Sequence, residues 1–414
     1  MGQAQDITDA PETPAPETLT EPREGTPEVI TDPAELARSC AALAAGSGAI
    51  AVDTERASGY RYWPKAYLVQ LRREGSGTHL IDPIALRGAL EPLVETLAGT
   101  EWVLHAASQD LPCLAELDLR PACLFDTELA GRLAGYDRVA LGTLVEVLLG
   151  YRLEKGHSAA DWSTRPLPTS WLNYAALDVE LLLQLRDVLR AELESQGKMG
   201  WALQEFEAVR TAGPPGPRAE PWRRTSGIHK VRSPRNLAVV RALWLARDEL
   251  ARQRDRAPSR VLPDSAIIAA ATSPPRTVED LRALPVFGGR MQRRLSAAWL
   301  RHIESARTLD DRDLPAASPT NGGPPPTSRW SDRDPDAAAR LSAARARLTK
   351  LAEANRLPVE NLLLPDLVRR LCWQPPSDRS VESVETALRD NGARTWQVEL
   401  TATLLSDALD QTAN

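Results

Sequence analysis

Two proline-rich breaks divide this chain of 414 residues and limit how much of it can fold as one unit. The first, at residues 213–217, reads Gly-Pro-Pro-Gly-Pro, and the second, at 315–335, contains Gly-Gly-Pro-Pro-Pro. Proline lacks the amide hydrogen that helix interiors and central strands need, so neither segment can continue a regular element. The sequence therefore predicts three folded units, at 29–212, 236–306 and 337–410, with a basic linker at 213–235 and a proline-rich linker at 307–336.

The first unit alternates short apolar runs with helix-period patterns. A helix start is marked by Asp32, a capping residue type, followed by Pro33, which suits the first helical turn. This interleaving predicts an α/β domain with a largely buried sheet, whereas the two later units show only helix-period leucines and are predicted to be all-α. We expect strands at 49–52, 67–71, 78–81, 102–104 and 123–125, and helices near 86–98, 108–118, 127–134, 141–149 and 170–195.

Charge is distributed unevenly along the chain. Residues 1–28 carry seven acids and one base, which accounts for the whole formal net charge of −6. Because this segment is rich in Pro, Glu and Thr and lacks apolar periodicity, we predict a disordered acidic tail. Residues 218–306 carry 18 Lys and Arg against 8 Asp and Glu. A basic module of this kind favours a polyanionic partner such as a nucleic acid.

Composition excludes several classes of protein. No run approaches the ~18 apolar residues that a membrane-spanning helix needs, and the N-terminal region lacks the basic and apolar segments of a secretion signal. The absence of a CxxC motif argues against a zinc site or a disulfide framework. The four cysteines lie far apart, at Cys40, Cys113, Cys123 and Cys372. We therefore expect a cytoplasmic, monomeric protein with reduced thiols and no membrane partner.

The most specific local signal is a pair of acids at the end of an apolar run. Residues 49–52 are followed by Asp53, Thr54 and Glu55, and the two-residue period of a strand puts both carboxylates on one face. Adjacent anions at the end of a buried strand need a cation, hydrogen-bond donors or shifted pKa values. The simpler alternative is a strand that ends there, with both acids in water.

Two further acids follow later apolar segments. Asp110 comes after the 102–104 run and falls in the first turn of the next predicted helix, where helix capping alone would explain it. Asp178 lies four residues after Tyr174 on a helical face that Leu181 extends, so it interrupts an apolar stripe. A hydrogen bond between Tyr174 and Asp178 is the simpler alternative there.

Taken jointly, the four acids favour metal chemistry. Two hard divalent cations about 3.5–4 Å apart require several carboxylates from different elements, and they promote in-line displacement at a phosphodiester. A tyrosine one helical turn from a metal-binding aspartate could orient the attacking water. Such a site needs no lysine or histidine base, and the five scattered histidines form no Ser-His-Asp or Cys-His grouping.

The order of these motifs resembles the DEDD superfamily of 3′–5′ exonucleases, in its tyrosine-bearing subgroup, and within it the bacterial ribonuclease D family. The motifs that carry the resemblance follow one another in the family's order: Val52-Asp53-Thr54-Glu55, Tyr67-Leu68-Val69-Gln70-Leu71, His105-Ala106 with Asp110-Leu111, Phe125-Asp126-Thr127, Lys155-Gly156, Asp161-Trp162-Ser163, Arg165-Pro166-Leu167 and Tyr174-Ala175-Ala176-Leu177-Asp178-Val179. Two departures are Ala160, where the family has serine, and residues 60–65, which differ from its Tyr-x-Pro pattern and could alter how the 3′ end of the substrate is held.

The resemblance implies an RNase H-like α/β exonuclease domain followed by two small all-α HRDC-type domains. Residues 236–306 resemble an HRDC domain, and residues 337–410 lie where the family carries a second HRDC-like unit. The implied activity is that of a 3′–5′ exoribonuclease that trims structured RNA, such as tRNA precursors, and releases 5′-mononucleotides. The resemblance also implies that Tyr174 positions the attacking water and that two Mg²⁺ or Mn²⁺ ions are bound by Asp53, Glu55, Asp110 and Asp178.

Six residues outside this set of ligands are candidates for nucleic-acid binding: Thr54, His105, Trp222, Arg223, Arg224 and Arg290. Thr54 and His105 lie inside the matching motifs. The Trp-Arg-Arg group could stack on a base and contact phosphates, although a tryptophan that fixes the linker to a neighbouring domain is an equal alternative. Arg290 follows a Phe-Gly-Gly turn, for which a simple helix connection is the plainer interpretation.

Two other functions stay open from sequence alone. A 3′–5′ DNA exonuclease would use the same metal chemistry, and the contacts to a 2′-hydroxyl that separate the two substrates are not visible in a sequence. The HRDC-like modules favour RNA. A non-catalytic nucleic-acid-binding scaffold is disfavoured, because all four acids and Tyr174 are present.

Overall fold

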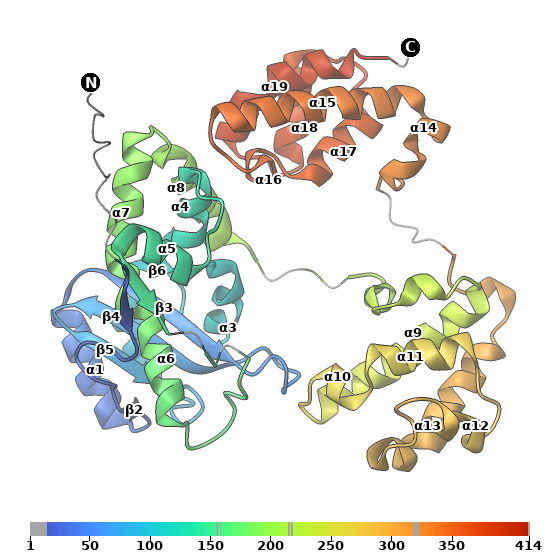
Figure 1. Ribbon diagram of the computed structural model, residues 1–414, viewed down its shortest axis with the longest axis horizontal. Helices are drawn as coiled ribbons and strands as arrows, with labels where there is room; N and C mark the ends of the chain where they lie inside the picture. Colours follow the sequence, from blue (N-terminus) through green and yellow to red (C-terminus); the bar gives the residue numbers. More distant parts are fainter. Residues whose placement is uncertain are drawn as a thin grey trace, which may run out of the picture.

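The computed structural model describes residues 15–154, 156–157, 159–213, 216, 218–317 and 323–412. Within these ranges the chain forms an N-terminal α/β domain followed by two helical domains (Figure 1). The predicted fold class is confirmed. Residues 1–14 of the predicted tail, Lys155 of the quoted motifs, and parts of both predicted linkers (214, 215, 217 and 318–322) lie outside the described residues.

A six-stranded mixed sheet forms the centre of the α/β domain, in the order β2-β5-β4-β3-β6-β7. β3 lies mid-sheet, antiparallel to β4 and parallel to β6, and its residues 49–52 are buried as the apolar run predicts. All five predicted strands are present. The strand bounds are Val29–Ile30 (β2), Ser47–Arg56 (β3), Ala66–Glu74 (β4), Gly77–Ile81 (β5), Glu101–Leu104 (β6) and Cys123–Asp126 (β7).

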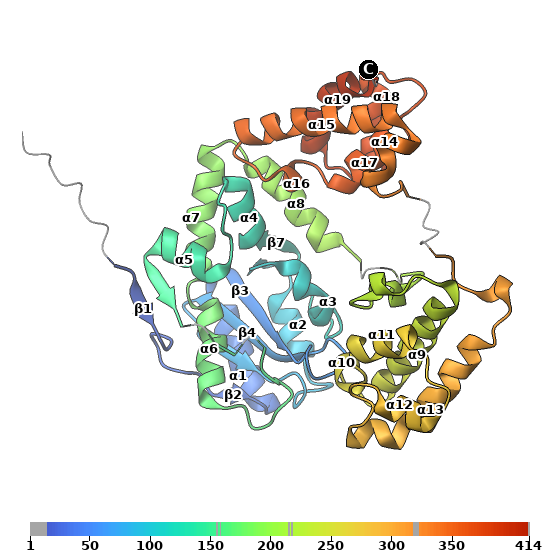
Figure 2. The same cartoon turned by 45° about the vertical axis from the view of Figure 1, so that its right-hand side comes forward.

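Most helices of this domain lie close to where the sequence places them, but the helix predicted at 170–195 is divided at Leu181, and Met199–Thr211 was not predicted. Asp32 caps the first helix by accepting hydrogen bonds from the backbone N–H groups of Ala34 and Glu35. α6 packs across β3, β4 and β5, and α7 packs on β3 and β6 (Figures 1 and 2). The bounds are Pro33–Ala45 (α1), Glu91–Leu97 (α2), Ala107–Gln109 (η1, a 3₁₀ turn), Leu111–Ala115 (α3), Thr127–Ala134 (α4), Leu141–Leu149 (α5), Thr169–Glu180 (α6), Leu182–Ser195 (α7) and Met199–Thr211 (α8).

The N-terminal segment is ordered from residue 15, so the prediction of disorder through residue 28 is wrong for its second half. Glu17–Leu19 (β1) pairs in parallel with Tyr151–Leu153 (β8). The guanidinium of Arg23 lies 4.7 Å from the centre of the Tyr151 ring. A strand of three residues is too short to show a period, and its partner lies far along the chain, so the sequence carried no local signal for it.

The middle helical domain begins earlier than predicted. Trp222, in the 3₁₀ turn Pro221–Arg224 (η2), is only 3% exposed and belongs to the hydrophobic core of this domain together with Val231. The linker predicted at 213–235 therefore includes core residues. The remaining elements are Ile228–Lys230 (η3), Pro234–Gln253 (α9), Pro258–Val261 (α10), Asp264–Thr272 (α11), Val278–Ala283 (α12), Arg290–Arg307 (α13) and Asp311–Asp313 (η4).

The C-terminal helical domain also extends into its predicted linker. Trp330 is buried in the core, and its indole N–H donates to the carbonyl oxygen of Pro325 at 2.9 Å, so the linker predicted at 307–336 is too long. Within the described ranges, none of the helices combines the length and apolar character that a bilayer crossing demands. The elements are Thr327–Arg329 (η5), Trp330–Arg333 (α14), Pro335–Ala354 (α15), Val359–Leu362 (α16), Pro365–Trp373 (α17), Val381–Asp390 (α18) and Thr395–Leu409 (α19).

The two helical domains repeat one pattern. α9, α10 and α11 have 20, 4 and 9 residues, and α15, α16 and α17 have the same lengths in the same order. After each long helix comes a residue with positive φ, which is 44° at Asp255 and 51° at Arg356. The next amide donates back into the helix, from Arg256 and Leu357 respectively. This shared turn supports the expectation that the C-terminal domain is HRDC-like.

Both of these turns face the α/β domain. Asp255 accepts hydrogen bonds from the backbone N–H groups of Tyr62 and Trp63, and the Arg356 backbone lies directly against Gly135. The C-terminal domain has a second attachment, in which Trp396 stacks on Trp201 of α8 with ring centres 5.0 Å apart. Each helical domain is thus fixed to the α/β domain by its own contacts.

Candidate active site

Asp53 and Glu55 lie on β3, just beyond the residues that pair with the parallel strand β6. β6 pairs with β3 only at Ile50 and Ala51, so the two acids lie beyond this pair, while the antiparallel pairing with β4 continues alongside them. Glu55 is 7% exposed, so the alternative of two acids in open water does not hold. Instead, a buried strand carries both carboxylates into a protein-lined site.

α6 brings Asp178 to these two acids. One carboxylate oxygen each from Asp53, Glu55 and Asp178 lies within 4.8 Å of the others. Ala175, a buried neighbour on the same helix, packs in the cluster under α6, which fixes the helix against the sheet. Tyr174, one turn earlier, hydrogen bonds to Asp178. The simple hydrogen-bond interpretation of this pair is therefore correct, and it is compatible with a role for both residues in the site.

Asp110 reaches the same site from the turn after β6. Its carboxylate accepts a hydrogen bond from the Thr54 hydroxyl at 2.8 Å and lies 3.5 Å from the Arg56 guanidinium. Arg56 also donates to the carbonyl oxygen of Gln109. Asp110 is not among the three acids with oxygens within 4.8 Å, but its charge acts on them, because it raises the pKa of Asp53, Glu55 and Asp178. The structure thus brings all four predicted acids to one site.

The electrostatics of this cluster are those of a site built for cations. Burial, together with the neighbouring acids, raises the pKa of Asp53 and of Glu55 well above their usual range, and burial raises the pKa of Asp178 to about 7. The Arg56 guanidinium acts in the opposite direction and lowers the pKa of Asp53 and of Glu55. Buried like charges repel each other unless a cation lies between them.

The donor set fits a hard divalent cation. Carboxylate oxygens from different elements are the ligands that Mg²⁺ and Mn²⁺ prefer. Beside Asp53, its cross-strand partner Gln70 is fully buried, and within the described residues neither amide atom of Gln70 has a hydrogen-bond partner. A buried amide without a partner is costly, so the site suits an ion and its bound water.

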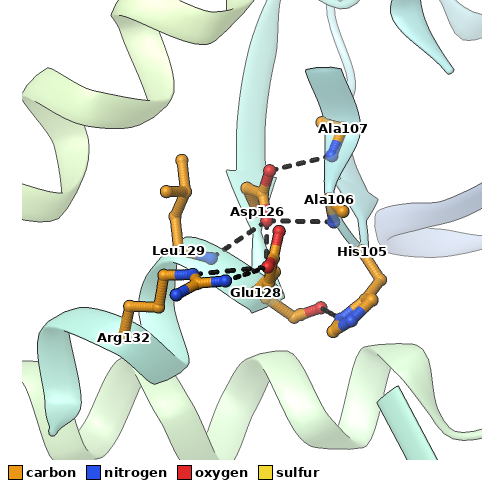
Figure 3. A network of polar contacts seen from close by, with 8 residues as sticks. His105, Ala106, Ala107, Asp126, Glu128, Leu129 and Arg132 are labelled. Atoms are coloured by element: carbon orange, nitrogen blue, oxygen red, sulfur yellow. Dashed lines mark hydrogen bonds and ion pairs between the residues drawn. The ribbon is translucent and has the colours of Figure 1, made fainter. Parts of the chain in front are cut away.

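The Phe-Asp-Thr motif fixes the turn that carries Asp110 (Figure 3). The Asp126 carboxylate accepts hydrogen bonds from the backbone N–H groups of Ala106 and Ala107, at 3.2 and 2.8 Å, and it also caps α4. Ala106 has a left-handed φ of 58°, a conformation that needs such support. From sequence alone, Asp126 belonged to a family motif but had no assigned role. Its role is to hold the backbone that positions Asp110.

A second anchor fixes the segment that leads into α6. The Arg165 guanidinium donates to both carboxylate oxygens of Asp82, at 2.6 and 3.0 Å, and to the carbonyl oxygen of Tyr67 at 2.7 Å. A bidentate arginine–carboxylate pair is rigid as well as strong. Arg165 therefore ties this segment to the sheet, and sequence reasoning assigned it no role beyond its motif.

The predicted nucleic-acid-binding residues divide into several groups. Trp222 is buried in the middle domain, so its predicted stacking on a base is wrong, and the alternative of an anchoring tryptophan is correct. The Thr54 hydroxyl is used by Asp110, and the Nδ1 atom of His105 lies 2.9 Å from the Thr127 hydroxyl in the network of Figure 3. Both side chains support the site from inside.

The three predicted arginines are placed differently from one another. The Arg223 guanidinium lies 4.3 Å from the centre of the Trp222 ring and pairs with Glu220 at 2.6 Å, so it is engaged within the middle domain. Arg224 and Arg290 are exposed, and a role for them in binding stays a prediction.

Comparison with known proteins adds three family matches. Residues 27–194 match a 3′–5′ exonuclease family, residues 236–303 match the HRDC domain, and residues 323–409 match the 3′ to 5′ exonuclease C-terminal domain. Ribonuclease D of Granulibacter bethesdensis is 33% identical over 298 residues, which is 70% of this chain and 74% of that protein. The chain belongs to the ribonuclease D family.

Two solved structures are similar to nearly the whole chain. A protein from Bifidobacterium adolescentis is 39% identical with a TM-score of 0.87, covering 96% of this chain and all of that one. Escherichia coli RNase D is 26% identical with a TM-score of 0.68, covering 94% of this chain and 99% of that one. Membership of the ribonuclease D family identifies the activity as that of a 3′–5′ exoribonuclease.

Proposed function

We propose that Asp53, Glu55, Asp110 and Asp178 hold two divalent cations, Mg²⁺ or Mn²⁺, and that the enzyme removes nucleotides from the 3′ ends of structured RNA as 5′-mononucleotides. The observation that carries this proposal is the set of three carboxylates with oxygens within 4.8 Å of one another, with Asp110 close enough to raise their pKa values. Such a set favours divalent cations because they relieve its repulsion.

The residues of the chain supply the geometry of the reaction. Bound cations supply an activated water and stabilise the charge on the departing 3′ oxygen. Asp53 and Glu55 are held by the sheet, and Thr54 and Arg56 hold Asp110 by a hydrogen bond and an ion pair. The pKa of Tyr174 is raised by burial and by the acids, so its hydroxyl stays protonated and orients the attacking water.

The HRDC domain supplies affinity for the RNA backbone. Its region carries the surplus of Lys and Arg noted above, and residues Arg290, Arg293 and Arg294 at the start of α13 are exposed. E. coli RNase D is described as an exoribonuclease involved in structured RNA processing. We extend that substrate class, with tRNA precursors as the leading example, to this chain.

Labelled RNA tests the proposal. RNA labelled at its 5′ end should give a ladder of products shortened from the 3′ end with Mg²⁺ or Mn²⁺ and none with EDTA. Asp53→Asn and Asp178→Asn should each slow release about a thousandfold or more, because they remove ligands of ions worth several kcal/mol in the transition state. Both variants should still fold, and their RNA affinity should stay near that of the wild type.

Three outcomes would contradict parts of the proposal. Full activity of either variant would refute the metal assignment, and equal degradation of matched DNA would point to a DNA exonuclease. Asp187→Asn is a matched control, because Asp187 is an exposed acid on α7 outside the site. Replacing Arg290, Arg293 and Arg294 with glutamine should lower the salt dependence of RNA binding by about 0.7 to 0.9 per lost phosphate contact. An unchanged slope would exclude these arginines.

A further inference from the structure

The loop between β3 and β4 leaves the sheet at the catalytic acids. The two strands pair as far as Glu55 with Leu68 and Arg56 with Ala66, so residues 57–65 form a hairpin loop whose base lies beside Glu55. In Figure 1 this loop extends from the sheet toward α10 of the HRDC domain. The loop therefore runs from the catalytic acids to the HRDC domain.

Hydrogen bonds fix the loop on the HRDC domain. The Asp255 carboxylate accepts from the backbone N–H groups of Tyr62 and Trp63, both at 3.2 Å. The Tyr62 hydroxyl donates to Asp248 at 3.2 Å, and the Tyr62 ring packs against the hydrophobic core of the HRDC domain. The apolar anchor of this junction is therefore Tyr62.

Arg260 reinforces the same junction. Its Nε–H donates to the carbonyl oxygen of Gly59 at 2.7 Å, and its guanidinium lies 3.9 Å from the centre of the Tyr60 ring. Asp255 itself has a left-handed φ of 44°, a conformation that its contacts to the loop help to hold. These contacts hold the loop backbone at Gly59 and again at Tyr62 and Trp63.

Trp63 is the side chain that this rigid loop leaves in solvent. It is 41% exposed, and among the large hydrophobic side chains that are exposed in the described residues it is the only aromatic one. Its ring meets the Tyr62 ring edge-on, with centres 5.1 Å apart and an interplanar angle of 83°. A tryptophan held by its backbone and by an edge contact is a low-entropy surface for another ring to stack on.

Three basic residues lie near Trp63, one in its own turn and two next to Asp255, which binds the Trp63 backbone N–H. Lys65 belongs to the same turn, because its backbone N–H donates to the Trp63 carbonyl oxygen at 2.8 Å, and Arg254 and Arg256 flank Asp255. All three side chains are exposed, and within the described residues none of them makes an ion pair, although the Arg256 guanidinium contacts the Met291 sulfur at 3.8 Å. Exposed cations next to an exposed aromatic ring form the pattern that single-stranded nucleic acid binds.

One cavity is lined both by Lys65 and by Cys113, a neighbour of Asp110. Its volume is about 680 Å³. The sulfur of Cys113 lies 3.4 Å from the Thr54 hydroxyl, which in turn donates to Asp110. Lys65 therefore lines the same cavity as Cys113, which contacts Asp110.

We propose that Trp63 is a stacking platform for a base of single-stranded RNA upstream of the scissile bond, with Lys65, Arg254 and Arg256 contacting the neighbouring phosphates. This inference rests on the RNA substrate of the proposed function and adds a binding site to it. The loop 57–65 joins the HRDC domain to the active site, and the platform on it holds the strand between the two.

A length series tests the platform. Trp63→Leu and Trp63→Phe are compared on RNA oligonucleotides from a dinucleotide upward in single-nucleotide steps. For Trp63→Leu we expect KM to rise about 5- to 150-fold once the RNA is long enough to reach the platform, which is the value of one base–aromatic stack. KM on the dinucleotide and kcat on all lengths should match the wild type. Trp63→Phe should recover most of the affinity, because it keeps an aromatic face.

Two results would overturn the inference. The first is an unchanged KM for Trp63→Leu at every length. The second is equal recovery by leucine and phenylalanine, because apolar packing would then be enough. If the wild type itself releases no nucleotide from any RNA, the proposed function fails, and this outcome is distinct from both.

An abasic substitution and a salt series separate stacking from charge. RNA with an abasic site at the nucleotide that reaches the platform should bind the wild type as weakly as intact RNA binds Trp63→Leu, and the two changes together should cost no more than either alone. Arg256→Gln should lower the salt slope by about 0.7, whereas Trp63→Leu should leave it unchanged. Leu245→Ala, on an exposed apolar position of α9, is the matched control and should behave as wild type. Additive losses would contradict direct stacking.

Discussion

Replacing Asp178 with asparagine should stabilise the metal-free enzyme while abolishing its activity. The folded-state pKa of Asp178 is about 7, against an ordinary value of 3.8. The folded chain therefore keeps a proton between these values that the unfolded chain releases, so stability falls as pH rises from about 4 to 7 and stays low above that. Three pKa units correspond to a cost of about 4 kcal/mol at most.

Asparagine removes this cost but not all of the burial penalty. The amide oxygen of the new side chain can still accept the Tyr174 hydrogen bond, whereas its N–H₂ group must find a partner, which we set at about 2 kcal/mol. The net gain at pH 8 in EDTA is then about 2 kcal/mol, or a rise in Tm of roughly 4–8 °C for a domain of this size. At pH 5 the wild-type carboxyl is already protonated, so the gain should vanish.

Thermal melts of both proteins at pH 5 and pH 8, with EDTA or Mg²⁺, measure this effect. Mg²⁺ at about 100 times its Kd should raise the stability of the wild type by about 2.7 kcal/mol and that of Asp178→Asn by clearly less. Asp187→Asn should shift neither melt. The reasoning is refuted if Asp178→Asn melts at or below the wild type in EDTA at pH 8, or if the difference is the same at both pH values.

Three further changes test the supports of the site. Asp126→Asn weakens the hydrogen bonds to the Ala106 and Ala107 amides, so kcat on labelled RNA should fall about 10- to 100-fold with little change in KM; an unchanged kcat would remove Asp126 from this role. Gly135→Ala would put a Cβ 2.8 Å from the Arg356 carbonyl oxygen at a residue with φ of 98°, so the C-terminal domain should become sensitive to limited proteolysis, and equal resistance would contradict the docking. Burial lowers the pKa of His105 to about 4, so the contribution of His105 to stability should fall by up to about 3 kcal/mol as pH falls from 6.5 to 4, opposite in sign to that of Asp178, and the difference in stability between the wild type and His105→Asn in urea titrations should change by that amount over this range.

The sequence predicted the parts of the fold that have a long local period. The apolar run before Asp53 and the stripe that Asp178 interrupts both span enough residues to define a strand and a helix, and both are where they were expected. The family resemblance then selected Asp110 from many possible helix caps. These three elements are the ones that carry the acids.

What could not be predicted depends on contacts between distant segments. β1 is too short to show alternation, and Trp222 has the same sequence neighbours whether it is buried or exposed. The role of Asp126 follows from backbone amides about twenty residues earlier, and no side-chain pattern encodes that. Residues 60–65 departed from the family pattern in sequence, but the attachment of this loop to the HRDC domain required the fold.

The turn that follows the first long helix of each helical domain has a mechanical consequence. Because each helical domain is attached to the α/β domain at such a turn, these contacts fix its position, and the linkers only connect the domains. Cleavage of the chain between the HRDC domain and the C-terminal domain should therefore give two fragments that elute together in size-exclusion chromatography. The cleaved enzyme should still degrade RNA.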